Sequence, residues 1–267
     1  MNIKLPYISK IGLLFLIISA VAGCAITPPA AEFIPINKGK KIAILVDANK
    51  YPHHTHLSVS EILSKGFTKR YEYDWKIEEL IIQALRDEIE PNTSFEVVSL
   101  RSLGLNQSKN ANFIHSQKGA WAHQADKTEQ IKKLQEQGVN IILNISEVRS
   151  VVSEYCNFYN KDICHHQYSE GYGLVSEASL LGNKFYASAS FDTQIETLNP
   201  PSNLTKHGKF YGINFDNNLN TELNYLGDPK YLKEVTEEEL EPVKRRIVKH
   251  FSIIGKKLAI YLKEKAA

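Results

Sequence analysis

The feature that most constrains the fold of this chain is a regular alternation of residue types between positions 184 and 196. Successive side chains of a β-strand point to opposite faces of the sheet, so a period of two predicts a strand with one buried face. The polar residues between the apolar ones predict a solvated second face, as in an antiparallel sheet. The residues expected to face the core are Phe185, Ala187, Ala189, Phe191, Thr193 and Ile195.

Other segments predict further strands and helices. The segment 41–47 has a continuous apolar run, 42–46, after its basic first residue, which is typical of a strand covered on both faces. Apolar residues at three- and four-residue steps predict an amphipathic helix over about 75–90 and a long C-terminal helix that starts at the capping box formed by Thr236 and Glu239. A helix ending at Gly138 precedes another strand. Further strands are expected over 95–100, 139–152 and 172–181, with a turn at 182–183, loops over 51–56 and 199–232, and a polar stretch over 106–127.

This order predicts an α/β fold: a mixed sheet of about five strands with flanking helices and a long C-terminal helix. The strands and helices lie within residues 40–267, which we interpret as a single α/β domain.

The N-terminus has the pattern of an export signal. A leader with Lys4 and Lys10 precedes an apolar run, Ile11–Val21, and small residues lead into a cysteine. The tetrad Val21–Cys24 resembles the lipobox of bacterial lipoproteins. This resemblance implies that residues 1–23 are a signal peptide, and that Cys24 carries a diacylglycerol and an amino-terminal acyl chain such as palmitate.

The resemblance also implies a location. An aspartate after the cysteine retains enteric-type lipoproteins at the inner membrane, so Ala25 favours the periplasmic face of the outer membrane. Residues 24–39 are rich in Pro and Ala, and we expect them to form a lipid-anchored tether. The alternatives are a plain transmembrane anchor, which the prolines at 28 and 29 interrupt, and a secreted chain cleaved after Ala22.

Charge excludes one class of partner. Removing residues 1–23 takes two lysines from the 32 basic residues and none of the 30 acidic ones, so the mature chain is balanced. Nonspecific binding to nucleic acid needs a basic surface, so we expect no nucleic-acid partner.

The remaining cysteines, Cys156 and Cys164, fall in a Tyr-rich segment expected to be a protruding hairpin over about 153–172. Two thiols so close in an oxidising compartment favour a structural disulfide bond. A redox-active or metal-binding pair is the alternative.

Histidines form two clusters. Imidazoles at these spacings can bind zinc or copper, and the two clusters could form one site if their loops lie at the same end of the sheet. The alternative is that they are solvated loop residues. The five residues are His53, His54, His56, His165 and His166.

Aromatic residues on the expected hairpin are typical of protein interfaces. Tyr155, Phe158, Tyr159 and Tyr168 are therefore candidate partner-binding residues, with covering of the sheet as the alternative.

Residues 41–47, 134–145 and 180–191 together resemble a domain shared by the amino-terminal part of the Tol translocation protein, curli-secretion lipoproteins and lipoprotein activators of peptidoglycan synthases. That resemblance implies binding of another envelope protein without catalysis. No nucleophile elbow, P-loop or dinucleotide fingerprint is present. We expect a non-enzymatic binding or assembly component without a cofactor. A metal-binding lipoprotein is the alternative, and a hydrolase with an unrecognised site is the third hypothesis.

Overall fold

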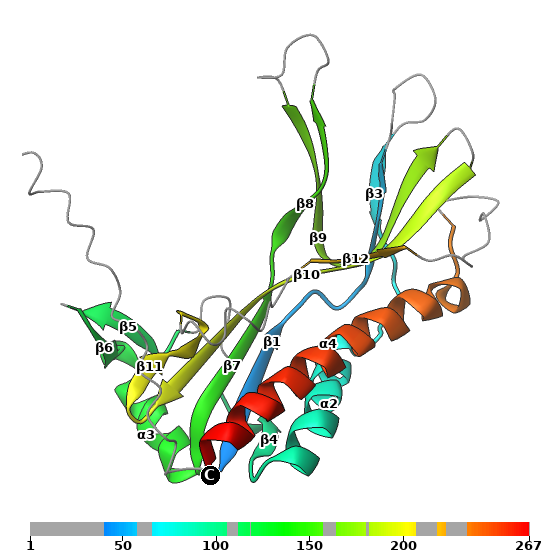
Figure 1. Cartoon of the computed structure of the whole chain (residues 1–267). Coiled ribbons are helices and arrows are strands. Elements are labelled where there is room, and N and C mark those ends of the chain that lie inside the picture. The colour runs from blue at the N-terminus through cyan, green and yellow to red at the C-terminus, as the bar shows by residue number, and fades with distance from the viewer. Residues whose placement is uncertain are drawn as a thin grey trace, which may run out of the picture.

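A computed structural model describes residues 40–57, 66–105, 112–117, 119–156, 164–179, 182–206, 218–222 and 234–266. The expected signal peptide and tether therefore lie outside the described residues. The centre of the molecule is a 10-stranded mixed sheet (Figure 1). Seven of its strands lie side by side in the order β3 (Phe67–Arg70), β2 (His53–Leu57), β9 (Cys164–Ser179), β10 (Gly182–Leu198), β7 (Val139–Glu147), β1 (Lys41–Asp47) and β4 (Glu96–Ser99).

Shorter pairings complete the β-structure. The strand β8 (Arg149–Cys156) pairs with β9, while β11 (Pro201–Asn203) and β12 (Asn218–Glu222) pair with β10. A separate two-stranded sheet consists of β5 (Ile114–Gln117) and β6 (Ala120–His123). Single 3-10 turns span Glu90–Asn92, Arg101–Leu103, Ala125–Lys127 and Leu204–Lys206.

The sheet changes direction at β10. Strand β1 is parallel to both of its neighbours, β4 and β7, whereas β10 is antiparallel to β7 and to β9. The mixed α/β class and the long C-terminal helix are confirmed. The sheet exceeds the expected five strands because short segments without an alternating pattern also join it.

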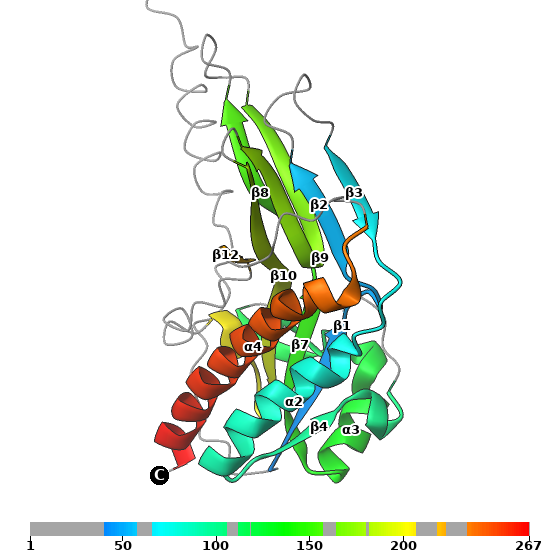
Figure 2. The same cartoon turned by 90° about the vertical axis from the view of Figure 1, so that its right-hand side faces the viewer.

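Helices cover both faces of the sheet (Figure 2). The main core joins α2 (Ile77–Ile89) and α4 (Glu237–Ala266) to one face, while α3 (Thr128–Glu136) packs against the other. In α2 the residues Ile81, Leu85 and Ile89 are fully buried, as the helical period predicts. The two helices of the main core approach closely at Gly255, where an added Cβ would lie 3.2 Å from the Cα of Leu85.

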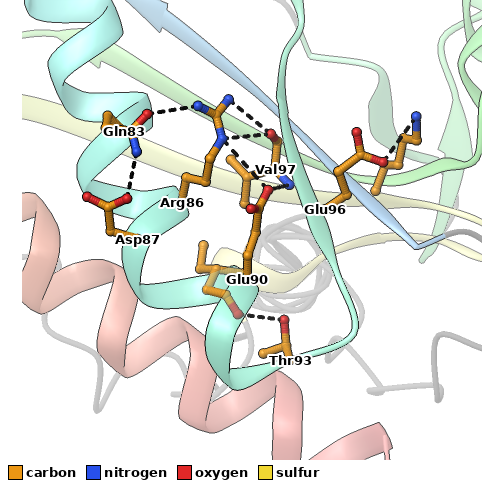
Figure 3. A network of polar contacts seen from close by, with 9 residues as sticks. Gln83, Arg86, Asp87, Glu90, Thr93, Glu96 and Val97 are labelled. Carbon is orange, nitrogen blue, oxygen red and sulfur yellow. Dashed lines mark hydrogen bonds and ion pairs between the residues drawn. The ribbon is translucent and has the colours of Figure 1, made fainter.

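Polar contacts attach α2 to β4 (Figure 3). The Arg86 guanidinium donates from Nε and Nη2 to the Val97 carbonyl, at 3.3 and 3.2 Å. The Glu90 carboxylate accepts the Val97 backbone N–H at 2.8 Å and lies 3.7 Å from Arg86 Nε. Charged groups from the helix thus satisfy both backbone groups of one strand residue, which fixes the helix against the strand.

Two sequence signals for helix ends are confirmed. Thr236 Oγ1 accepts the Glu239 N–H at 3.3 Å, and the Glu239 carboxylate accepts the Thr236 N–H at 2.7 Å, which is the reciprocal capping box at the start of α4. After α3, Gly138 has a positive φ of 82°, as expected of a helix-terminating glycine.

Other predictions of local structure are wrong. Residues 53–57 form a fully buried strand rather than a polar loop. Residues 182 and 183 are the first two residues of β10, where they pair with β9, and they do not form a turn. The region 199–232, expected to be a loop, contains β11 and β12.

The second face of β10 is only partly solvated: Lys184 is exposed, whereas Ser188, Ser190 and Glu196 are buried. At Glu196 the cover comes from Phe113, whose backbone N–H donates to the carboxylate at 2.8 Å.

None of the helices in the described ranges is both long and apolar enough to cross a lipid bilayer.

Glu196 makes the stability of the fold depend on pH. Burial raises the pKa of its carboxyl from 4.5 to about 7. Since the folded chain binds this proton more tightly than the unfolded chain, the associated stability is present below pH 4.5 and is lost as the pH rises through 7. The difference between the two pKa values corresponds to about 3 kcal/mol.

The variant Glu196→Gln lacks this ionisation and keeps an oxygen for the Phe113 N–H. Its free energy of unfolding relative to the wild type should therefore increase by up to about 3 kcal/mol between pH 5 and pH 8. Urea unfolding at both values measures this, with the exposed Glu129→Gln as the control. An identical pH dependence in wild type and Glu196→Gln would show that the carboxyl does not titrate in this way.

Candidate functional site

A two-stranded ribbon extends from the sheet, and we take it as the candidate functional site. It consists of β8 and the first part of β9, paired from Arg149 opposite Glu170 to Cys156 opposite Cys164. The remainder of β9, Gly171–Ser179, pairs instead with β10 and β2. Figure 1 shows the ribbon rising past the other strands, so the predicted protruding hairpin begins earlier than expected, at Arg149.

The base of the ribbon is held by buried contacts. Tyr172, the last residue of the expected hairpin, is only 1% exposed and stacks on Phe191 with ring centroids 6.3 Å apart. Its hydroxyl donates to the Asn49 carbonyl at 2.9 Å, and the Asn49 N–H donates to the Glu147 carboxylate at 2.8 Å. The ribbon therefore starts from a rigid part of the core, and Tyr172 belongs to that core.

Two glycines permit the close packing at this base. Gly171 has a φ of 67°, and a Cβ there would lie 2.5 Å from the Glu147 carboxyl carbon. Gly173 has a φ of 147°, and a Cβ there would overlap the backbone of His53 in β2. Only glycine fits a positive φ combined with such contacts.

The backbone register places Cys156 directly opposite Cys164. Residues opposite each other in an antiparallel pair have Cα atoms about 4.5 to 5.5 Å apart, which lies within the range that a disulfide spans. The register therefore supports the predicted bond, which stays a prediction.

The intact mass of protein purified without reductant should increase by two protons on reduction, and digestion without reductant should yield one linked peptide. Two alkylated thiols in protein purified without reductant would rule the disulfide out.

The predicted partner-binding residues are distributed along the ribbon and beyond the described residues. Tyr155 lies in β8 opposite His165, and Tyr168 lies in β9 opposite Val151. Phe158 and Tyr159 lie outside the described residues, between the two strands. The topology thus assigns two of the four candidates to the ribbon.

The first histidine cluster is not on a solvated loop. His53, His54 and His56 lie in β2 and are at most 4% exposed. Three hydrogen bonds join the buried groups: Tyr71 Oη to His54 Nδ1 at 2.7 Å, His54 Nε2 to Ser176 Oγ at 2.6 Å, and Ser176 Oγ to His56 Nδ1 at 2.8 Å. This series of hydrogen bonds supplies partners for buried polar side chains, which the sequence alone did not identify.

Burial also favours the neutral form of His53 and His56. Burial, and then the charge of Arg70, lowers the pKa of His53 to about 4, and burial lowers that of His56. A Ser–His pair at 2.6 Å has the spacing of a nucleophile and its base. However, Ser176 and His54 are 0% exposed, so a substrate has no access to them. We interpret the network as a structural support for β2.

The two histidine clusters do not meet. His53 pairs with Gly173 of β9, whereas His165 lies eight residues earlier in β9 and pairs with Tyr155. Within the described part of the chain, no three His, Cys, Asp or Glu residues are grouped so that they could hold a metal ion.

Comparison of the chain with protein-family models, with curated proteins and with solved structures gives no match.

Proposed function

We propose that this protein is a lipid-anchored component of the bacterial cell envelope that binds another envelope protein through the β8–β9 ribbon, without catalysing a reaction. The observation that carries the proposal is the ribbon itself. Across the described residues, β8 pairs only with β9, and the first part of β9 pairs only with β8. Within the described residues, neither outer edge of the ribbon pairs with a further strand, so a partner strand could be added at either edge.

The position of the ribbon suits this role. Lys41, where the described chain begins its first strand, lies beside Val139 at the start of β7, whereas β8 follows the far end of β7. In Figures 1 and 2 the start of β1 and the tip of the ribbon lie at opposite ends of the molecule. A tether from Cys24 would join the domain at the first end, so the ribbon would point away from the membrane.

The chemistry of the ribbon supports protein binding. Tyr155 and Tyr168 of the ribbon, with Phe158 and Tyr159 between its two strands in the sequence, supply aromatic rings, which are typical anchors of protein interfaces. A disulfide between Cys156 and Cys164 would order the ribbon before binding and reduce the entropy lost on association.

The role of the aromatic residues is tested by the double variant Phe158→Ala, Tyr159→Ala. Core aromatics replaced by Ala cost about 3 to 5 kcal/mol of stability, whereas exposed contact residues cost little. We expect a nearly unchanged melting temperature and at least a tenfold loss of the partner recovered after crosslinking in intact cells, which corresponds to about 1.4 kcal/mol.

The matched control is Lys132→Ala with Glu136→Ala, two exposed residues of α3 that lie outside the ribbon. This control should recover the partner normally. A large fall in melting temperature of the ribbon variant would place the rings in the core, and normal recovery of the partner would remove them from the interface.

Neither a metal-binding nor a hydrolytic role has a candidate centre within the described ranges, and we propose neither.

A further inference from the structure

The outer face of α4 carries a stripe of basic and apolar residues that no other part of the described structure covers. Its members recur at three- and four-residue steps, which places them on one side of the helix, and all are exposed. We call this set the basic stripe: Arg246, Lys249, Ile253, Lys256, Ile260 and Lys263.

The charge of the stripe is of one sign. The sequence has no acidic residue between Glu241 and Glu264. Glu241 lies 3.9 Å from both Lys244 and Arg245, which are outside the stripe. Among the ion pairs of the described residues, none involves a base of the stripe. Its four cations therefore remain available to an external anionic surface.

Two apolar side chains lie between the basic residues of the stripe. Ile253 and Ile260 are the exposed large apolar residues of the described structure, and they lie seven positions apart on the same helix face. Their opposite face of α4, which includes Ile247, Phe251 and Leu258, is fully packed in the core. A core helix that also exposes isoleucines between lysines has the composition of a helix that lies on an anionic membrane surface.

The position of α4 in the molecule is compatible with contact between the stripe and a membrane surface. The helix ends at the same end of the molecule where β1 begins (Figures 1 and 2). With a lipid at Cys24, residues 24–39 would connect this end to the bilayer over at most about 50 Å of extended chain. The stripe would thus be within reach of the headgroups, while the ribbon would lie on the far side.

We propose that the basic stripe of α4 docks on the surface of a bilayer that contains anionic phospholipid. The four bases contact headgroup phosphates, and Ile253 and Ile260 enter the boundary between headgroups and acyl chains. This inference rests on the proposed anchoring, because the lipid at Cys24 supplies the high local concentration of membrane.

Tryptophan fluorescence tests the docking. The full acylated chain with Ile260→Trp is reconstituted into vesicles with brominated acyl chains, which quench a tryptophan only at close approach. We expect quenching beyond that of the wild type in vesicles with phosphatidylglycerol, and none in vesicles of phosphatidylcholine alone. The control Lys184→Trp, at an exposed position of β10, should show no added quenching in either.

A charge variant identifies the cause. In the Ile260→Trp background, replacing the four bases of the stripe by Gln should abolish the added quenching, because each base near an anionic surface changes the docking equilibrium about fivefold. A matched variant instead replaces four exposed lysines outside the stripe, and it should be quenched as before. These four are Lys69, Lys132, Lys133 and Lys184.

Three results would overturn the docking proposal: no added quenching at position 260, equal quenching in both kinds of vesicle, or quenching that survives loss of the four bases. If the stripe variant instead loses a bound protein while lipid quenching is absent, the stripe binds an acidic protein and not a membrane. Intact mass of the same sample reports acylation. A chain without lipid at Cys24 contradicts the anchoring alone, since its sedimentation with phosphatidylglycerol vesicles still tests the stripe.

Discussion

Gly173→Ala should destabilise the protein by about 4 kcal/mol or more, which combines the cost of a strained backbone with that of forced overpacking. Gly173 has a φ of 147°, and an added Cβ would overlap the backbone of His53. The two residues are partners in the parallel pairing of β2 with β9. Relief of the overlap requires β2 to move away, which would break the buried contacts of His54 with Tyr71 and Ser176.

Urea unfolding of the full chain in mild detergent measures this effect. The matched control is Gly119→Ala, because Gly119 also has a positive φ, 82°, but an added Cβ there meets nothing within 4 Å. We expect the control to lose only about 1 to 2 kcal/mol. Equal losses for the two variants would mean that the close approach of β2 to Gly173 does not matter for stability.

Cys24→Ala should abolish membrane attachment of the processed chain. Each buried methylene of an acyl chain contributes about 0.8 kcal/mol, so several chains hold a protein firmly, while a chain without lipid has only weak surface contacts. The variant should lose all acyl labelling, and it should appear either in the soluble fraction or as a precursor that retains residues 1–23.

The matched control is Cys156→Ala, which changes a cysteine on the ribbon and leaves the lipobox intact. It should incorporate labelled acyl chains at the wild-type level and remain in the membrane fraction. Wild-type labelling of Cys24→Ala would exclude this cysteine as the acylated residue.

Periodic patterns in the sequence were sufficient for the larger elements. The apolar stripe of α2, the capping box of α4 and the inward residues of β10 were all predicted from spacing, because each buries one continuous face.

Strand β2 was not predictable from spacing. Its sequence, His-His-Thr-His-Leu, has one aliphatic residue and no apolar alternation, which is typical of a loop. It is buried because Tyr71 and Ser176, distant in the sequence, supply hydrogen-bond partners for His54 and His56. A sequence pattern does not report partners brought together by the sheet, so a tertiary contact determines the structure here.

The ribbon was predictable from the sequence only in part. Its cysteines and aromatic residues indicated a hairpin, but the sequence did not show that β9 changes partners at Gly171. This change follows from Tyr172, which enters the core beside Phe191 and ends the exposed part of the strand. The glycines on either side of Tyr172 were a usable signal, since Gly-Tyr-Gly allows the backbone to bend around one anchored ring.

The intact mass of the wild-type chain purified from membranes tests the central claim, lipid anchoring, most directly. The account predicts a polypeptide that begins at Cys24 and carries the added mass of a diacylglycerol and one further acyl chain on that residue. A chain that begins at another residue without lipid, or one that retains residues 1–23, would contradict it.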